Sequence, residues 1–417
     1  MKNLLRILEY VGMMCWLVRA SLDSYEVGVK IGSDIAAIKM LHRERMEECR
    51  VEPMQEVVEM IYIGIDVHKK FCVACIKDRD GAVLAQLKFP NNSKGMDKLL
   101  ELVDGRPAKA VVESTGNLWL RLYITLEEVG VEVILSNPSK TKAIAEARLK
   151  NDKVDASILA DLLRANLVAQ CYVPPSSVRE LREILRVRMN LVKDRTRVKN
   201  RIHALLDRYE PPKFEGTDMF GKGGMKWLRG IELTSTDSFV LNTYTNQIEF
   251  LNGLVQDLER AIAQVAVDDE DCQLLMTIPG ISFYTAMMVS SEIGDIERFP
   301  SSNKLVSWLG LAPRVRQSGN TLHHGHITKM GSPRVRGVLV QAAHTAVRYD
   351  NHFRSKYERI GARRGKGKAI VAVARELAVA CFHMLKRREP YKFMDIGLVR
   401  RKYKRMESVA KSTLCIG

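Results

Sequence analysis

The stretch from Ile61 to Asp155 places the strongest constraint on how this chain can fold. Short apolar runs rich in β-branched residues predict buried strands, and the later runs alternate with amphipathic stretches of helical length. The expected order is β-β-β-α-β-α-β-α, an antiparallel meander continued by parallel crossovers. Strands are expected at 61–67, 71–77, 82–89, 108–113 and 131–136, and helices at 93–104, 117–130 and 138–149. The sequence therefore predicts a mixed-sheet α/β domain.

Four carboxylates mark the ends of these elements. Asp66 and Glu113 end buried strands, and Asp152 and Asp155 begin a helix, where a spacing of three puts both on one face. Each alone has a simpler explanation, because such positions often hold turn residues or helix caps. Together they supply the hard oxygen ligands that Mg²⁺ or Mn²⁺ prefers, and two such ions about 4 Å apart can catalyse phosphoryl transfer. We therefore expect the four to form one metal site.

The charge balance points to a polyanionic partner. The 417 residues carry a net charge of +16, and 46% of them are hydrophobic, which is ordinary for a globular protein. The excess is uneven, with ten Lys/Arg against four Asp/Glu in 179–208 and thirteen against two in 312–368. Although charge alone can serve solubility, this clustering favours a nucleic acid.

Membrane insertion and a disulfide framework are not expected. No apolar run is long enough to span a bilayer, and the eight cysteines are scattered, which favours a reducing cytoplasm. Cys72 and Cys75 form a CxxC within a strand, where they face opposite sides, so we interpret them as core thiols rather than zinc ligands.

Two long helices are expected after the first domain. The basic helix over 176–208 carries an imperfect heptad stripe and includes Arg195 and Lys199, which are candidates for nucleic-acid contacts. A second helix covers about 239–265, with an irregular insert at 209–236 between them. The pair fits either a helical hairpin within one chain or a coiled coil between chains.

The last part of the chain is expected to be mainly helical. The pattern helix, Ile278-Pro279-Gly280-Ile281, helix resembles a helix-hairpin-helix motif, in which Gly280 would let backbone amides approach a phosphate; a plain packing element is the alternative. Residues 300–337 are expected to be loop-rich, and the tail after 390 to be mobile.

The expected domains follow from these patterns. Residues 1–59 show no pattern typical of a folded domain, and one hypothesis is that translation starts at Met60 or the nearby Met54 instead of Met1. The remaining segments are the α/β domain at 60–170, the long helices at 171–268, a C-terminal domain at 269–390 and a basic tail at 391–417.

From its position alone, Ser318 fits best an ordinary turn serine before a glycine, and only the basic residues around it raise the alternative of a nucleophile. The surrounding cations could hold a scissile phosphate: Arg314, Arg316, Lys329, Arg334 and Arg336. Ser332 competes as nucleophile, but its place before Pro333 suggests a turn or cap. For His323, His324 and His326 we prefer exposed or DNA-facing roles.

Several motifs resemble one family in the same order. YIGIDVHKK, VVESTG and KNDKVDA, followed by TIPGI, SWLGLAPRVRQSGN and ITKMGSPRVR, are similar to IS110/IS1111-type transposases and the related Piv invertase, over roughly 61–390. The resemblance implies an RNase H/RuvC fold whose DEDD metal site consists of Asp66, Glu113, Asp152 and Asp155. It also implies that Ser318 attacks a DNA phosphate and forms a phosphoserine ester. Further implied partners are DNA at element ends and target, an element-encoded guide RNA, and a homo-oligomer, a dimer or tetramer.

The sequence motifs are also compatible with other functions. A RuvC-like junction nuclease would use water in place of Ser318, and a Piv-type invertase would use the same parts for inversion. A non-catalytic helix-hairpin-helix protein would not need the carboxylates. An actin-like kinase also begins with a GID strand, but no Gly-rich nucleotide loop follows.

Overall fold

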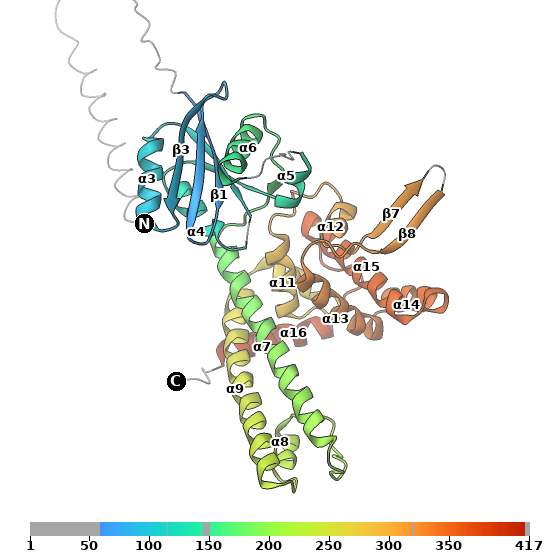
Figure 1. Ribbon diagram of the computed structural model, residues 1–417. Coiled ribbons are helices and arrows are strands. Elements are labelled where there is room, and N and C mark those ends of the chain that lie inside the picture. The colour runs from blue at the N-terminus through green and yellow to red at the C-terminus, as the bar shows by residue number, and fades with distance from the viewer. Residues whose placement is uncertain (1–58, 115, 145–150, 319–320, 413–417) are drawn as a thin grey trace, which may run out of the picture. The chain divides into compact units, whose positions relative to one another are not determined.

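The computed structural model describes residues 59–114, 116–144, 151–318 and 321–412. The chain divides into two compact units, and the boundary between them along the sequence lies between Tyr172 and Val173 (Figure 1). The proposed start-site region before 59 lies outside the described residues. No helix in the described ranges combines the length and apolar character needed to cross a membrane.

The N-terminal unit is built on a six-stranded mixed sheet in the order β3-β2-β1-β4-β5-β6. β1 pairs antiparallel with β2 and parallel with β4, and β5 continues the parallel part, so the predicted meander and crossovers are confirmed. A short β6, which the sequence did not predict, closes the edge antiparallel to β5. The strands are β1 Ile61–Val67, β2 Phe71–Lys77, β3 Val83–Pro90, β4 Ala108–Glu113, β5 Glu132–Ser136 and β6 Gln170–Cys171.

Helices cover both faces of this sheet. The helices are α3 Ser93–Val103, α4 Trp119–Glu128, α5 Pro138–Ile144 and α6 Asp152–Arg164. On one face, Leu159 and Leu163 of α6 pack against Val111 of β4. On the opposite face, Ile63 and Ile65 of β1 are fully buried on the side of α3 and α4 (Figure 1). Both faces of β1 are therefore covered, as its apolar sequence predicts.

Gly64 lets α6 lie directly on β1. A Cβ atom at this position would come within 2.1 Å of the Ala156 carbonyl oxygen and 2.4 Å of the Ala160 backbone nitrogen. Because both obstacles are backbone atoms, no side-chain rotation can relieve the clash. The glycine thus sets the distance between the strand that carries Asp66 and the helix that carries Asp152 and Asp155.

Gly64→Ala should therefore force α6 away from the sheet. We expect the free energy of unfolding to fall by about 1–3 kcal/mol, as for overpacked cores, with weaker divalent-metal binding. Denaturant titration of the full chain measures the first effect. Gly253→Ala is the control, because a Cβ there meets nothing within 4 Å and its helix should gain up to about 1 kcal/mol. Unchanged stability in Gly64→Ala would contradict this role.

The long helices of the C-terminal unit form a hairpin within the chain. These are α7 Ser176–Leu206, α8 Lys222–Arg229 and α9 Ser235–Ala266. Val198 and Ile202 of α7 share a buried cluster with Leu241 and Ile248 of α9 (Figure 1). The expected irregular insert contains α8, whose Leu228 joins this cluster, so that expectation was only partly right.

The remaining helices enclose the most extensive hydrophobic core of the described residues. They are α10 Glu270–Met276, α11 Phe283–Ile293, α12 Ser302–Trp308, α13 Pro333–Tyr349, α14 Asn351–Arg364, α15 Lys366–Arg387 and α16 Ile396–Lys411. Leu185 of α7 and Ile262 of α9 belong to this core, so the hairpin and the C-terminal segment form one unit.

Two segments are more ordered than their sequences suggested. The loop-rich region contains a β-hairpin, β7 Pro313–Ser318 and β8 Thr321–Ile327. The tail, expected to be mobile, forms α16: Met406 is buried, and Lys402 Nζ donates to the carbonyls of Met276 and Ile278. Burial lowers the pKa of Lys402 to about 8.

Candidate metal and DNA-processing site

The four predicted carboxylates belong to the same end of the sheet. Ile65 pairs with Val112 in the parallel ladder, so Asp66 and Glu113 follow at the carboxyl ends of adjacent strands. Residues aligned in a parallel ladder point to the same face, and Gly64 shows that this is the face covered by α6. Asn151 caps α6 by accepting from the Val154 amide, which places Asp152 and Asp155 in its first turn.

The structure brings Asp66 and Asp152 together and adds His68 to them. Ligand atoms of these three side chains lie within 4.8 Å of one another, the one such group of acidic, Cys or His side chains in the described ranges. His68 Nε2 is 3.0 Å from Asp66 Oδ2 and 3.4 Å from Asp152 Oδ1. Glu113 and Asp155 are half-buried at the same end of the sheet but lie outside this group.

The surroundings of Asp66 perturb its ionisation. Burial raises its pKa above the usual value; nearby His68 opposes this shift, and the charges of Asp152 and Asp155 add to it. A cluster of carboxylates without a cation repels itself, and a divalent ion would remove both costs. The donor set therefore fits a Mg²⁺ or Mn²⁺ ion.

Asp161, which lies on the same helix, has a different role. Its Oδ2 accepts from the buried Lys77 Nζ at 2.6 Å. This pair ties α6 to β2, and it neutralises a lysine that would otherwise be buried alone. Asp161 therefore belongs to the packing of α6.

Ser318 is the last residue of β7, where it pairs with Thr321 of β8. The base of this hairpin is tightly built. Gly310 and Gly331 both have positive φ and bring the end of α12 close to the segment between β8 and α13. Added Cβ atoms would meet the Met330 and Trp308 carbonyl oxygens at 2.2 and 1.9 Å. Ser332 caps α13 by accepting from the Val335 amide, the role its place before a proline suggested.

The cations predicted to hold phosphate differ in their surroundings. Arg314 and Lys329 are exposed, and Arg334 is half-buried, whereas the side chain of Arg316 lies outside the described set. Arg336 Nη1 donates to the carbonyls of Leu309 and Gly331, and burial lowers its pKa. Arg336 therefore connects the segments before and after the hairpin by hydrogen bonds.

Three other predicted contacts also have structural partners. Gly280 has φ +88°, and a Cβ there would meet the Ala342 carbonyl oxygen at 2.4 Å, so the glycine lets this turn pack on α13. Arg195 donates to Asn252 at 2.7 Å, and Lys199 lies over the Phe220 ring with a pKa lowered by burial and by Arg195. Their nucleic-acid roles stay predictions.

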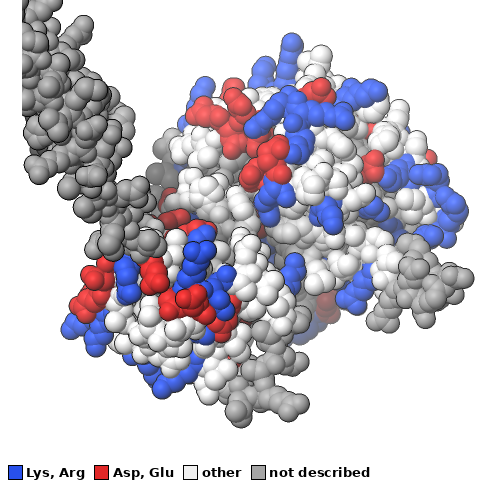
Figure 2. Space-filling model, turned by 90° about the horizontal axis from the view of Figure 1, so that it is seen from above, with Lys and Arg blue, Asp and Glu red and all other residues white. Residues whose placement is uncertain are grey.

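An additional basic surface lies at the α14–α15 turn. Its five cations are exposed, and none forms an ion pair within the part of the chain described: Arg359, Arg363, Arg364, Lys366 and Lys368. Figure 2 shows Lys and Arg gathered at the right edge, the side on which α14 lies in Figure 1.

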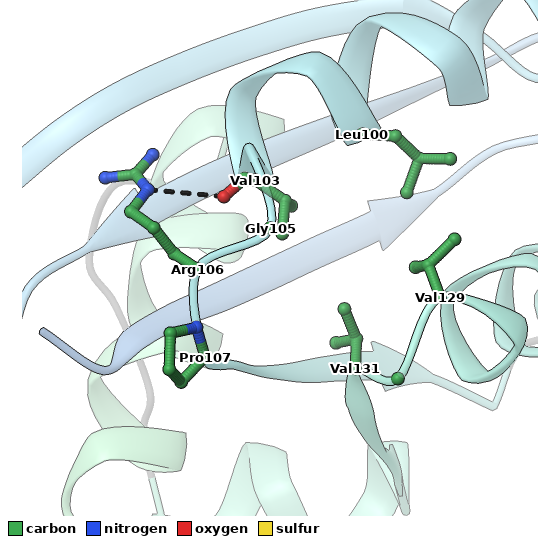
Figure 3. Close-up of a pocket in the computed structure, with 8 residues that line it drawn as sticks. Leu100, Val103, Gly105, Arg106, Pro107, Val129 and Val131 are labelled. Carbon is green, nitrogen blue, oxygen red and sulfur yellow. Dashed lines mark hydrogen bonds between the residues drawn. The ribbon is translucent and has the colours of Figure 1, made fainter. Parts of the chain in front are cut away.

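A pocket of about 310 Å³ lies at the other end of the sheet. Leu100, Val103, Val129 and Val131 line it beside Arg106, whose Nε donates to the Val103 carbonyl (Figure 3). It opens where β4 and β5 begin, opposite the carboxyl ends that carry Asp66 and Glu113. No acidic side chain lines it, so it is unsuited to hold the metal ion.

Sequence reasoning missed His68. The signal was present, because residues two apart in an extended strand share a face, and His68 follows Asp66 by two.

Comparison with known proteins agrees with this geometry. A family model described as a transposase, the DEDD type of IS110 elements, matches residues 63–211. A second, described as the transposase IS116/IS110/IS902 family, matches 272–358, and together the two cover more than half of the chain.

Individual transposases are similar to this chain over most of their own length. The transposase for insertion sequence element IS1111A of Coxiella burnetii is 28% identical over 343 residues, 79% of this chain and 91% of the relative. The transposase for insertion sequence element IS1328 of Yersinia enterocolitica is 26% identical, covering 67% of this chain and 82% of that protein. The chain belongs to the IS110 family of transposases.

Proposed function

We propose that this transposase cuts and rejoins DNA strands with a divalent-metal site held by Asp66, Glu113, Asp152 and Asp155. The observation that carries the proposal is the convergence of carboxylates at one end of the sheet. The six-stranded order with α6 across it supports an RNase H/RuvC-like assignment of the N-terminal unit. The ion, Mg²⁺ or Mn²⁺, would stabilise charge on the reacting phosphate oxygens.

Ser318 is the proposed nucleophile. Its Oγ–P bond forms as the P–O bond to the leaving strand breaks, and the proton from the serine is transferred to the leaving oxygen. A hydroxyl of the receiving strand then attacks the phosphoserine, which restores Ser318 and joins the DNA. The support is the placement of Ser318 at the end of a hairpin with a rigid base, and the resemblance of LGLAPRVRQSG to the family's nucleophile segment.

The C-terminal unit supplies the proposed DNA-binding cations. Exposed Arg314 lies in β7, exposed Lys329 follows β8, and the α14–α15 turn adds unpaired positive charge on the same unit. Contacts of this kind bind phosphates without reading sequence. Gly280, in a helix-hairpin-helix, and Arg195, Lys199, Arg316, Arg334 and Arg336 are further proposed contacts.

The resemblance also supports three partners or settings for this activity. We propose that a structured guide RNA selects the DNA, that the protein acts as a homo-oligomer, and that it works in the cytoplasm.

Metal removal tests the proposed function. Cleavage of DNA that carries the element ends should stop in EDTA and resume when Mg²⁺ or Mn²⁺ is restored, because the carboxylates alone repel a phosphate. A gel assay with end-labelled DNA measures this. Undiminished cleavage in EDTA would contradict the metal site.

A further inference from the structure

We propose that His68 binds the same divalent ion as Asp66 and Asp152 through its Nε2 atom, and that this nitrogen shifts the site's preference toward Mn²⁺. The inference rests on the proposed function, since it concerns the same metal site. It adds a neutral nitrogen donor to a set that the sequence presented as carboxylates alone.

The position of His68 is fixed by its backbone and its ring. Its amide donates to the Phe71 carbonyl at 2.9 Å, and its own carbonyl accepts from Asn91 Nδ2 at 2.9 Å. The imidazole lies 4.6 Å from the Phe71 ring, which limits its rotation. The side chain is therefore held in place before any ion binds, as a metal ligand should be.

The atoms of the group are spaced as ligands of one ion. Neighbouring ligands of an octahedral ion, each about 2.1 Å from it, lie about 3 Å apart. The observed separations from Nε2 are 3.0 Å to Asp66 Oδ2 and 3.4 Å to Asp152 Oδ1.

The nearest polar neighbours of the ring atom Nε2 are the two carboxylates of the same group. Although 41% of the side chain is exposed, Nε2 itself is buried and makes no well-aligned hydrogen bond to any described residue. A buried polar atom without such a bond is costly unless an ion or water completes it.

A competing explanation is that a protonated His68 only neutralises the two carboxylates. The explanations predict opposite effects of removing the ring. If His68 competes with the ion, its loss strengthens metal binding; if His68 is a ligand, its loss weakens binding. The weakening should be greater for Mn²⁺ than for Mg²⁺, because Mg²⁺ favours oxygen donors whereas imidazole suits the transition metals.

Manganese binding to the full chain tests the inference without reference to activity. Pulsed EPR of bound Mn²⁺ should show coupling to an imidazole nitrogen, and His68→Ala should remove it. The same variant should lower Mn²⁺ affinity at least about tenfold, with a smaller loss for Mg²⁺ in competition titrations. His344→Ala, which removes an exposed histidine from α13, is the matched control and should change neither result.

The outcomes separate this inference from the proposed function. If Asp66→Asn abolishes Mn²⁺ binding but the wild-type signal shows no nitrogen coupling, His68 is not a ligand and the carboxylate site stands. Unchanged or tighter Mn²⁺ binding in His68→Ala likewise overturns the inference. If wild type binds no Mn²⁺, or Asp66→Asn leaves binding intact, both fail.

Discussion

Replacing Asp66 by asparagine should abolish strand cleavage while leaving the protein folded. The substitution keeps the shape of the side chain but removes the negative charge of an acidic ligand whose side chain is only 13% exposed. Loss of metal stabilisation worth several kcal/mol corresponds to a fall in rate of about three orders of magnitude or more. The measurement is the single-turnover rate on end-labelled DNA at saturating Mg²⁺.

Stability and a control separate this effect from misfolding. Burial and the charges of Asp152 and Asp155 disfavour an ionised Asp66 without metal, so Asp66→Asn should unfold at the same or a higher temperature in EDTA. Asp104→Asn is the matched control, because Asp104 is exposed and caps α3 in a left-handed conformation that Asn tolerates. Wild-type cleavage by Asp66→Asn would remove this residue from the catalytic site.

Ser318→Ala should eliminate the covalent protein–DNA adduct and strand transfer. Without the hydroxyl no phosphoserine can form, so we expect a loss of about a thousandfold or more. Denaturing gels of labelled DNA detect the adduct directly.

Ser332→Ala is the control for this substitution. It removes the α13 cap and should cost about 1 kcal/mol of stability, yet it should retain the adduct. Unaffected cleavage in Ser318→Ala would instead favour water as nucleophile, as in a junction nuclease.

The sequence was most informative where local pattern and buried position coincide. The β-branched runs through Ile65 and Val112 are typical of buried strands. The order of strands along the chain, and the position of Asp66 and Glu113 at the ends of two of them, could therefore be predicted. Asp152 and Asp155 were placed at a helix start because an amphipathic pattern follows them, and the structure adds Asn151 as the cap.

Contacts distant in sequence could not be predicted in the same way. Gly280 packs against the backbone of Ala342, which lies far away in the sequence. Arg336 donates hydrogen bonds to the carbonyls of Leu309 and Gly331. The sequence predicted both residues as phosphate contacts, and it did not reveal these packing partners. The segment that forms α16 was expected to be mobile because it is rich in charged residues. Its Met406 is buried by contacts with helices earlier in the chain, which the local sequence does not reveal.

Anomalous diffraction from crystals grown with Mn²⁺ tests the central claim most directly. The account predicts a manganese peak at the carboxyl end of β1, within about 2.3 Å of carboxylate oxygens of Asp66 and Asp152. Crystals of Asp66→Asn should lose this peak. A wild-type structure with Mn²⁺ bound only elsewhere, or with no ion at this end of the sheet, would contradict the claim.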